Sequence, residues 1–344
     1  MKYCVNLIII LTMRQFRIFW SLLVGVALFA SCKQECVIIM TPFPIERYIE
    51  YSTYDTYGIF DPIEVVLSNK YLILKGMKSD PIFQQYELPN MHYVKSFGNR
   101  GRGPNEFSSP PMMYSLRGQE KIYISHSCSE GESFTGYLIS ENGDLIPQDT
   151  LIATNGNGLY NNYHIINDSL LVYNLLPNEF GIEKINLSTN SFPTKIQFTK
   201  NKHYKGEDFF HPDFGTLSVN NQYIVYVYMF RKQIDIYNLD DLTLKVRLLA
   251  KRHRQTITTS EQSKRYYYDV YVTENFIYAV YIDPDTDDKK NKYFVEVFDF
   301  NGTPVKRYNI GTSLWGMFAV SSDDSTMYSY NWELEKILKF DLAE

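Results

Sequence analysis

Short runs of alternating apolar and polar residues recur along the chain at a nearly constant interval. Each run contains a strand rich in Tyr, Ile or Leu, and this strand usually follows a turn that contains Asn, Asp or Gly. Alternation with a period of two is typical of strands with one packed face and one wetter face. Neighbouring runs start 48 to 53 residues apart, at residues 71, 122, 170, 223, 276 and 327. The pattern therefore predicts six copies of one β-sheet unit.

A second strand, in most units also alternating, follows the first in every unit. These partner strands are found at 83–88, 137–140, 182–187, 234–239, 295–300 and 337–342. A four-stranded unit of about 50 residues has the size of a propeller blade, and radial stacking of blades buries faces that no single blade could bury. We therefore predict an all-β fold, a six-bladed β-propeller of four-stranded antiparallel blades.

The sixth unit is one strand short, because the sequence ends at Glu344 just after the third strand of that unit. We expect the segment 45–53, which precedes the first unit's inner strand at 62–67, to supply the missing outer strand. Closing the ring with an N-terminal strand removes an edge that would otherwise pair with other chains. No linker rich in Pro, Ser or Gly interrupts residues 45–344, so this range is predicted to be one propeller domain.

The N-terminal segment has the pattern of an export signal. Arg14 and Arg17 precede an apolar run from Ile18, and small residues follow it. The end of the segment, Phe29-Ala30-Ser31-Cys32, resembles a lipobox, although Phe29 replaces the usual Leu. We therefore expect residues 1–31 to be a lipoprotein signal peptide, with acylation at Cys32 and a lipid-anchored tether over 32–44.

Other interpretations of this segment stay open. The apolar region 8–30 is long enough for an uncleaved membrane helix, but two arginines within it would cost roughly 2.5–3.5 kcal/mol each. Simple secretion is a further alternative, and Met13 is a second candidate start. The expected location is the bacterial cell envelope, as an outer-membrane lipoprotein that faces the periplasm or the cell surface.

Composition narrows the classes of partner. The formal net charge is -5, so no basic excess suggests a nucleic-acid partner. Beyond Cys32 the chain has only Cys36 and Cys128, which are too few for a disulfide framework, although a single bridge between them is possible.

The first unit ends in Phe97-Gly98-Asn99-Arg100-Gly101-Arg102-Gly103-Pro104-Asn105-Glu106-Phe107. This stretch resembles the F-G-x-x-G-x-G-P-x-E-F junction of TolB-like six-bladed β-propeller lipoproteins, which are related to NHL-repeat propellers. With the six-fold period and the lipobox, the resemblance covers nearly the whole mature chain. It implies the fold but no activity, because propellers include both binding proteins and enzymes. No Lys-Ser/Thr pair follows the glycines, so we do not expect a phosphate loop.

Motifs that would indicate catalysis are weak. The acidic stretch 283–288 lacks the Gly and the final Glu of a calcium loop, and the six histidines show no H-E-x-x-H spacing. The basic run 251–254 is best explained as a solvated loop. We predict no catalytic residue, no metal and no cofactor. A metal-dependent lyase or hydrolase with its site in the central channel remains the alternative, because blades bring distant residues together.

The crossovers that enter the inner strands are the best candidates for ligand binding, since such loops surround one mouth of the channel of a propeller. Aromatic rings and arginines there suit a peptide or a glycan. The residues at these positions are Arg100, Arg102, Tyr160, Asn161, His211, Asp213, Arg265, Tyr266 and Trp315. Packing between blades is an equally good explanation for several of them. We expect a non-catalytic binding or scaffold module for an envelope protein, peptide or glycan, attached to the lipid bilayer.

Overall fold

A computed structural model describes most of the chain after the N-terminal segment. The described residues are 36–343 without 104–105, 108–110, 112, 116–120, 129–130, 154–160, 176–179, 190–193, 199–209, 252–262, 284–291, 313 and 315–316. The predicted signal peptide and Cys32 lie outside this part. No helix of the described part is long and apolar enough to span a membrane.

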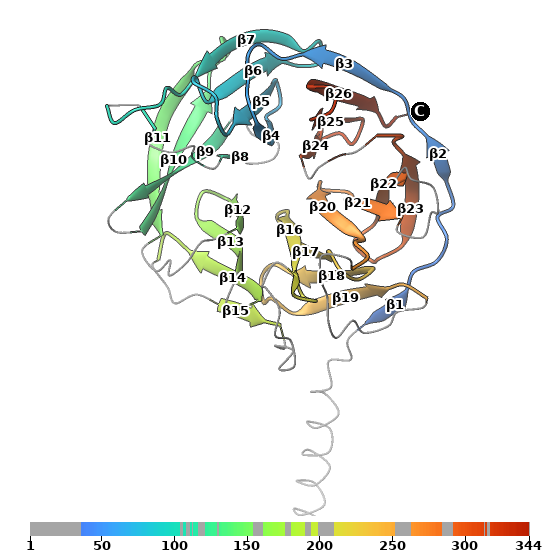
Figure 1. The fold of residues 1–344 in the computed structure, drawn as a ribbon. Coiled ribbons are helices and arrows are strands. Elements are labelled where there is room, and N and C mark those ends of the chain that lie inside the picture. Colours follow the sequence, from blue (N-terminus) through green and yellow to red (C-terminus); the bar gives the residue numbers. More distant parts are fainter. Residues whose placement is uncertain are drawn as a thin grey trace, which may run out of the picture. The chain divides into compact units, whose positions relative to one another are not determined.

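Residues 37–344 form one compact unit, a ring of six mostly antiparallel sheets around a central axis (Figure 1). The prediction of a six-bladed, all-β propeller is confirmed. Blade 1 contains β4 (Pro62–Leu67), β5 (Tyr71–Gly76), β6 (Phe83–Glu87) and β7 (His92–Phe97). Blade 2 contains β8 (Met113–Ser115), β9 (Lys121–Cys128), β10 (Gly131–Ile139) and β11 (Leu145–Ala153). Blade 3 contains β12 (Asn161–Ile166), β13 (Leu170–Leu175), β14 (Gly181–Asn186) and β15 (Thr194–Gln197).

The second half of the ring repeats this order from the inner strand outward. Blade 4 contains β16 (Gly215–Val219), β17 (Tyr223–Tyr228), β18 (Gln233–Asn238) and β19 (Leu244–Leu249). Blade 5 contains β20 (Tyr267–Val272), β21 (Ile277–Asp283), β22 (Lys292–Phe298) and β23 (Pro304–Asn309). Blade 6 contains β24 (Phe318–Val320), β25 (Thr326–Asn331) and β26 (Lys336–Asp341).

The middle strands of each blade are buried on both faces, which explains their nearly continuous apolar sequences. In β17, for example, residues from Ile224 to Tyr228 are all buried. Alternate side chains of such a strand face opposite neighbouring blades. Val225 and Val227 pack into the core between blades 4 and 5, whereas Ile224 and Tyr226 pack into the core between blades 3 and 4. The ring is therefore held together by one interface core between each pair of blades.

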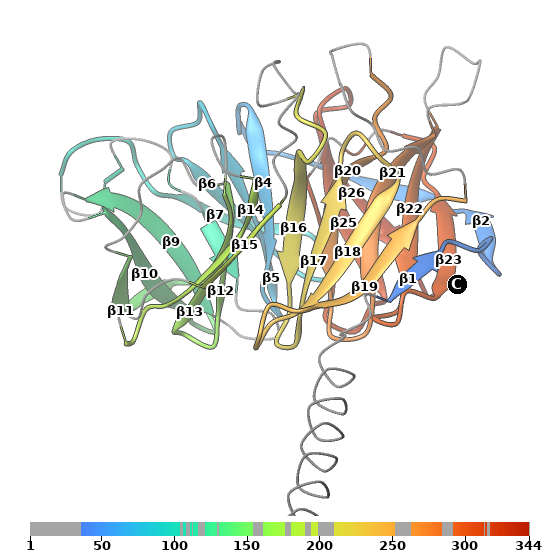
Figure 2. The ribbon, with the colours of Figure 1, turned by 90° about the horizontal axis from the view of Figure 1, so that it is seen from below.

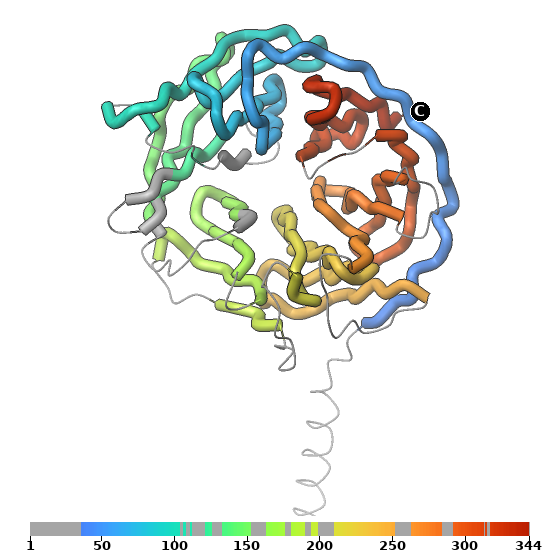
Figure 3. The backbone as a smooth tube through the Cα atoms, viewed as in Figure 1, coloured from blue at the N-terminus to red at the C-terminus, as the bar shows by residue number. Residues whose placement is uncertain are grey.

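The N-terminal segment runs around the outside of three successive blades (Figure 3). Strand β3 (Tyr51–Asp55) pairs antiparallel with β26 and is the outer strand of blade 6. Before it, β1 (Val37–Ile39) and β2 (Glu46–Tyr48) add as parallel fifth strands to blades 4 and 5. Closure by an N-terminal strand is confirmed, but the donor is 51–55 rather than 45–53. The first pairing strand also lies within the predicted tether.

The connections between strands define two ends of the ring (Figure 2). Turns join the first strand to the second in every blade, and the third to the fourth in blades 1 to 5, and all of these turns lie at one end, which we call the hairpin end. The loops from the second to the third strand and the crossovers to the next blade lie at the other end, the crossover end. The predicted ligand residues belong to the crossover end.

Candidate functional site

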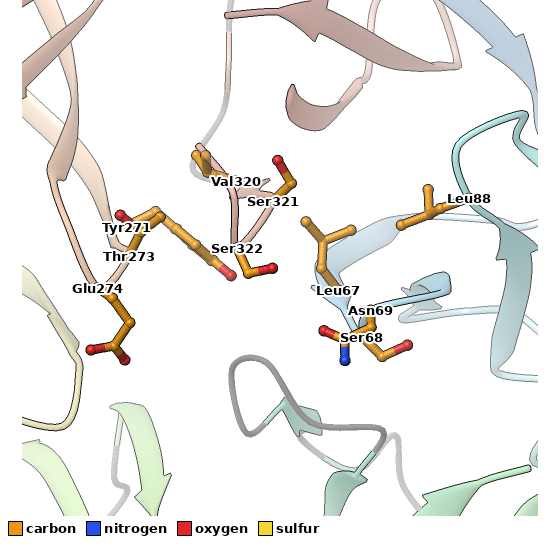
Figure 4. A pocket seen from close by; sticks show the side chains of 10 residues that line it. All are labelled: Leu67, Ser68, Asn69, Leu88, Tyr271, Thr273, Glu274, Val320, Ser321 and Ser322. Atoms are coloured by element: carbon orange, nitrogen blue, oxygen red, sulfur yellow. The ribbon is translucent and has the colours of Figure 1, made fainter. Parts of the chain in front are cut away.

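A pocket opens at the hairpin end between blades 5, 6 and 1 (Figure 4). It encloses about 620 Å³, part of which is open solvent. Its apolar wall is formed by Leu67, Leu88, Val320 and the ring of Tyr271, which comes from the inner strand of blade 5. Polar residues complete the lining, and these are Ser68, Asn69, Thr273, Glu274, Ser321 and Ser322.

Most hydroxyl groups at the edge of this pocket already stabilise their own turns. The hydroxyl of Ser68 accepts the amide hydrogen of Tyr71 at 3.1 Å. The hydroxyl of Thr273 likewise accepts the amide hydrogen of Phe276 at 3.0 Å, and that of Ser321 accepts the amide hydrogen of Thr326 at 3.0 Å. Few of the hydroxyl groups are thus free to recognise a ligand. The pocket suits an apolar group better than a group with many hydroxyls.

The hairpin end is acidic. In the turns that the structure describes there, Lys70 is the single cation, and the acids are Glu141, Asp144, Asp168, Asp240, Asp241, Glu274, Asp299, Asp323 and Asp324. Two of these acids are paired with lysines from strands, Asp144 with Lys95 at 2.6 Å and Asp168 with Lys121 at 3.0 Å. Hydrogen bonds from the hydroxyls of Ser321 and Ser325 lower the pKa of Asp323, which stays ionised at neutral pH. Such a distribution of charge attracts cationic groups toward the pocket.

The glycine-rich junction at the crossover end is closed by the side chain of Glu106. The carboxylate of Glu106 accepts the amide hydrogen of Gly103 at 2.8 Å and occupies the space that a Cβ on Gly101 would need. Gly98 has a φ of 78°, and a Cβ there would lie 2.6 Å from the ring of Phe83. The glycines therefore serve close packing and a sharp turn.

The two arginines of this junction differ. The Arg100 guanidinium donates to the carbonyl oxygens of Met77 and Ser79, the second at 2.9 Å, so it fixes the loop that follows β5. Arg102 is exposed. The ligand role of both arginines stays a prediction.

His211 and Asp213 lie together at the start of β16, where both are buried. The His211 ring stacks on Phe180 at 4.0 Å between ring centres, and its Nδ1 accepts the amide hydrogen of Asp213 at 3.0 Å. The Asp213 carboxylate pairs with Arg231, whose guanidinium lies 3.9 Å from the centre of the Tyr228 ring. This cluster packs blade 4 against blade 3.

The other predicted ligand residues are partly described. Arg265 is half-buried and donates to the hydroxyl of Tyr268 at 3.3 Å, and Tyr266 packs against the core between blades 4 and 5. Asn161 begins β12, but its side chain lies outside the described residues, as do Tyr160 and Trp315. Most of the acidic stretch 283–288 and of the basic run 251–254 also lies outside them.

Metal-binding chemistry finds no support in the described residues, where no group of three His, Cys, Asp or Glu side chains could hold an ion. Cys36 is free and exposed there. Sequence reasoning missed the pocket, although the repeated polar turns between the first and second strands, such as 68–70 and 273–275, were a signal for that end of the ring.

Comparison with known proteins agrees with the fold. Two solved structures align with this chain over nearly all of their own length. A member of the DUF4221 family from Bacteroides vulgatus has a TM-score of 0.55 at 13% identity and covers 86% of this chain and 97% of its own. A protein from Bacteroides fragilis described as exported has a TM-score of 0.51 at 12% identity and covers 88% and 98%. These likenesses concern the fold alone.

No curated protein matches the sequence. The model of the TolB-like 6-blade propeller-like family matches residues 48–323, from the second N-terminal strand into blade 6. The chain therefore belongs to the TolB-like six-bladed propeller family.

Proposed function

We propose that this protein is a lipid-anchored, non-catalytic binding module of the bacterial cell envelope, and that its propeller holds a peptide segment of a partner protein in the hairpin-end pocket. The observation that carries the proposal is the pocket itself, which three neighbouring blades build from an apolar wall and an acidic surround. Apolar side chains that anchor in such pockets supply most of the binding energy of many protein interfaces.

A peptide is favoured over a glycan by the state of the edge hydroxyls. A glycan needs many free donors and acceptors, but Ser68, Thr273 and Ser321 use theirs within the turns. The lipid anchor is supported by the sequence before Cys32 and by the exported relative from Bacteroides fragilis. Acylation at Cys32 would leave few residues before β1, so the propeller would stay close to the membrane surface.

The pocket is tested with acetylated, amidated Gly-X-Gly peptides in which X is Ala, Leu, Phe, Lys or Glu. Binding is measured by changes in the NMR spectrum of the protein, with a disaccharide of N-acetylglucosamine as the glycan probe. Ser322→Trp fills the pocket from its exposed edge, and Ser188→Trp places the same bulk on an exposed turn of blade 3.

We expect peptides with long side chains to bind, Ser322→Trp to abolish binding, and Ser188→Trp to leave it unchanged. Binding of the sugar alone, or equal peptide binding by both variants, would contradict the pocket's role. The anchor is tested separately by mass spectrometry of the mature N-terminus. Cys32→Ala should leave an unprocessed, unlabelled precursor, and normal maturation of this variant would rule out the lipoprotein.

A further inference from the structure

Three buried acids of the propeller each pair with a cation, whereas the partly exposed Asp269 does not pair with one among the described residues. Asp235 pairs with Arg247 at 2.9 Å, Glu296 pairs with Lys232 at 2.9 Å, and Asp213 pairs with Arg231. A carboxylate is costly to bury without such a cation. Asp269 has no ion-pair partner among the described residues, and its Oδ1 only accepts the amide hydrogen of Val270 at 2.8 Å.

The position of Asp269 relates it to the pocket. It lies on β20, the inner strand of blade 5, two residues before Tyr271, so both side chains share one face of the strand. Val270 and Val272 face the other way, into the core between blades 4 and 5. Two residues span about 6.6 Å along a strand, so Asp269 lies one step deeper in the ring than the pocket wall at Tyr271.

The charge state of Asp269 follows from its surroundings. The side chain keeps limited contact with solvent, and burial raises the pKa of its carboxyl group to about 8. On the strands packed against β20, the titratable residues are tyrosines, apart from Asp283 at the crossover end of β21, which pairs in register with Lys292. No cation of these described strands thus competes for the carboxylate. One carboxylate cannot supply the six to eight oxygens that Ca²⁺ needs.

We propose that the pocket receives a lysine side chain, whose aliphatic stem lies along Leu67, Val320 and Tyr271 and whose ammonium group reaches Asp269. The inference rests on the proposed peptide-binding function and names the class of its anchor. A four-carbon stem can lie along the apolar wall, and its ammonium group can extend past the lining to Asp269, which does not itself line the pocket but lies two residues before Tyr271 on the same strand. The acidic hairpin end attracts the same cation. Binding converts Asp269 to its carboxylate form and releases a proton.

The test compares two probes, acetylated and amidated Gly-Lys-Gly and its norleucine counterpart, which has the same four carbons without the ammonium group. Titration calorimetry follows binding between pH 6 and 9, in two buffers of different ionisation enthalpy, for the unaltered protein and for Asp269→Asn. Because Asn is isosteric and neutral, this variant keeps the acceptor for the Val270 amide. A thermal melt confirms that it folds.

We expect the lysine peptide to bind at least about 10-fold more tightly than the norleucine peptide, a difference of about 1.4 kcal/mol. It should release close to one proton at pH 7, and its affinity should rise with pH up to about 8 and then level. Asp269→Asn should lose the preference, the proton release and the pH dependence. Equal binding of both peptides would overturn the lysine inference and keep the peptide pocket. Binding of neither would overturn both proposals.

Discussion

The charged residues next to the pocket at the hairpin end differ from those at the crossover end in how they are engaged. At the crossover end, Arg100 is bound to backbone carbonyls and Arg231 is paired with Asp213, so these cations hold loops and blades together. At the hairpin end, Glu274 is exposed beside a pocket, and deeper along the same inner strand Asp269 has no ion-pair partner among the described residues. Arginine and aromatic content alone therefore does not indicate which end binds a ligand. The decisive quantity is whether a charge already has a partner.

The largest expected effect on stability comes from removing a carboxylate at the crossover end. Asp213→Ala leaves the guanidinium of Arg231, whose side chain is only 13% exposed, without its carboxylate, which should lower the free energy of unfolding by about 3–5 kcal/mol. Urea unfolding of the purified domain measures this loss. Glu274→Gln is the matched control, because it removes an exposed acid from the hairpin end and should change stability by less than about 0.5 kcal/mol. Equal losses in the two variants would mean that the two ends do not differ.

The fold was predictable from sequence to the extent that it depends on local signals. Runs such as 71–74 and 223–226 repeat because every blade needs a buried second strand after a polar turn, and period-two alternation is visible in a single sequence. Strands β1 and β2 have three residues each and gave no comparable signal. Their pairing depends on outer edges of blades 4 and 5 that lie some 200 residues or more further along the chain.

The site could not be predicted in the same way. Leu67, Tyr271 and Val320 meet only because the ring brings blades 1, 5 and 6 together, and none of them is unusual in its own stretch of sequence. The ion pair between Asp213 and Arg231 likewise forms only in the folded chain and has no signal in the sequence. The strand pattern in the sequence placed Arg, His and Asp residues at the crossovers, where the structure has them. It does not show which of these side chains already have a hydrogen-bond or ion-pair partner.

An effect of intermediate size is expected in the pH dependence of stability, through Asp269. The pKa of Asp269 is about 8 in the folded chain against 3.8 for an ordinary aspartate. Between these values the folded protein holds a proton that the unfolded chain releases, so this group lowers stability as pH rises through that window, and the loss is complete above about 8. Asp269→Asn stays neutral. It should match the unaltered protein at pH 4 and become steadily more stable than it toward pH 8, by at most about 1.4 kcal/mol for each pH unit of this window, as measured by urea unfolding. A constant difference across this range would mean that Asp269 is ionised throughout.

The smallest effect separates the two arginines of the glycine-rich junction. Arg100→Ala removes hydrogen bonds to the carbonyls of Met77 and Ser79 and should cost ~1–2 kcal/mol of stability. Arg102 is exposed, so Arg102→Ala should change stability by less than about 0.5 kcal/mol. Both variants should bind the lysine peptide as the unaltered protein does, because that site lies at the other end of the ring. If Arg102→Ala weakens binding of a natural partner by ~1–3 kcal/mol without affecting stability, the crossover end also contributes to recognition. In that case the difference between the ends would lie in the class of ligand group that each one holds.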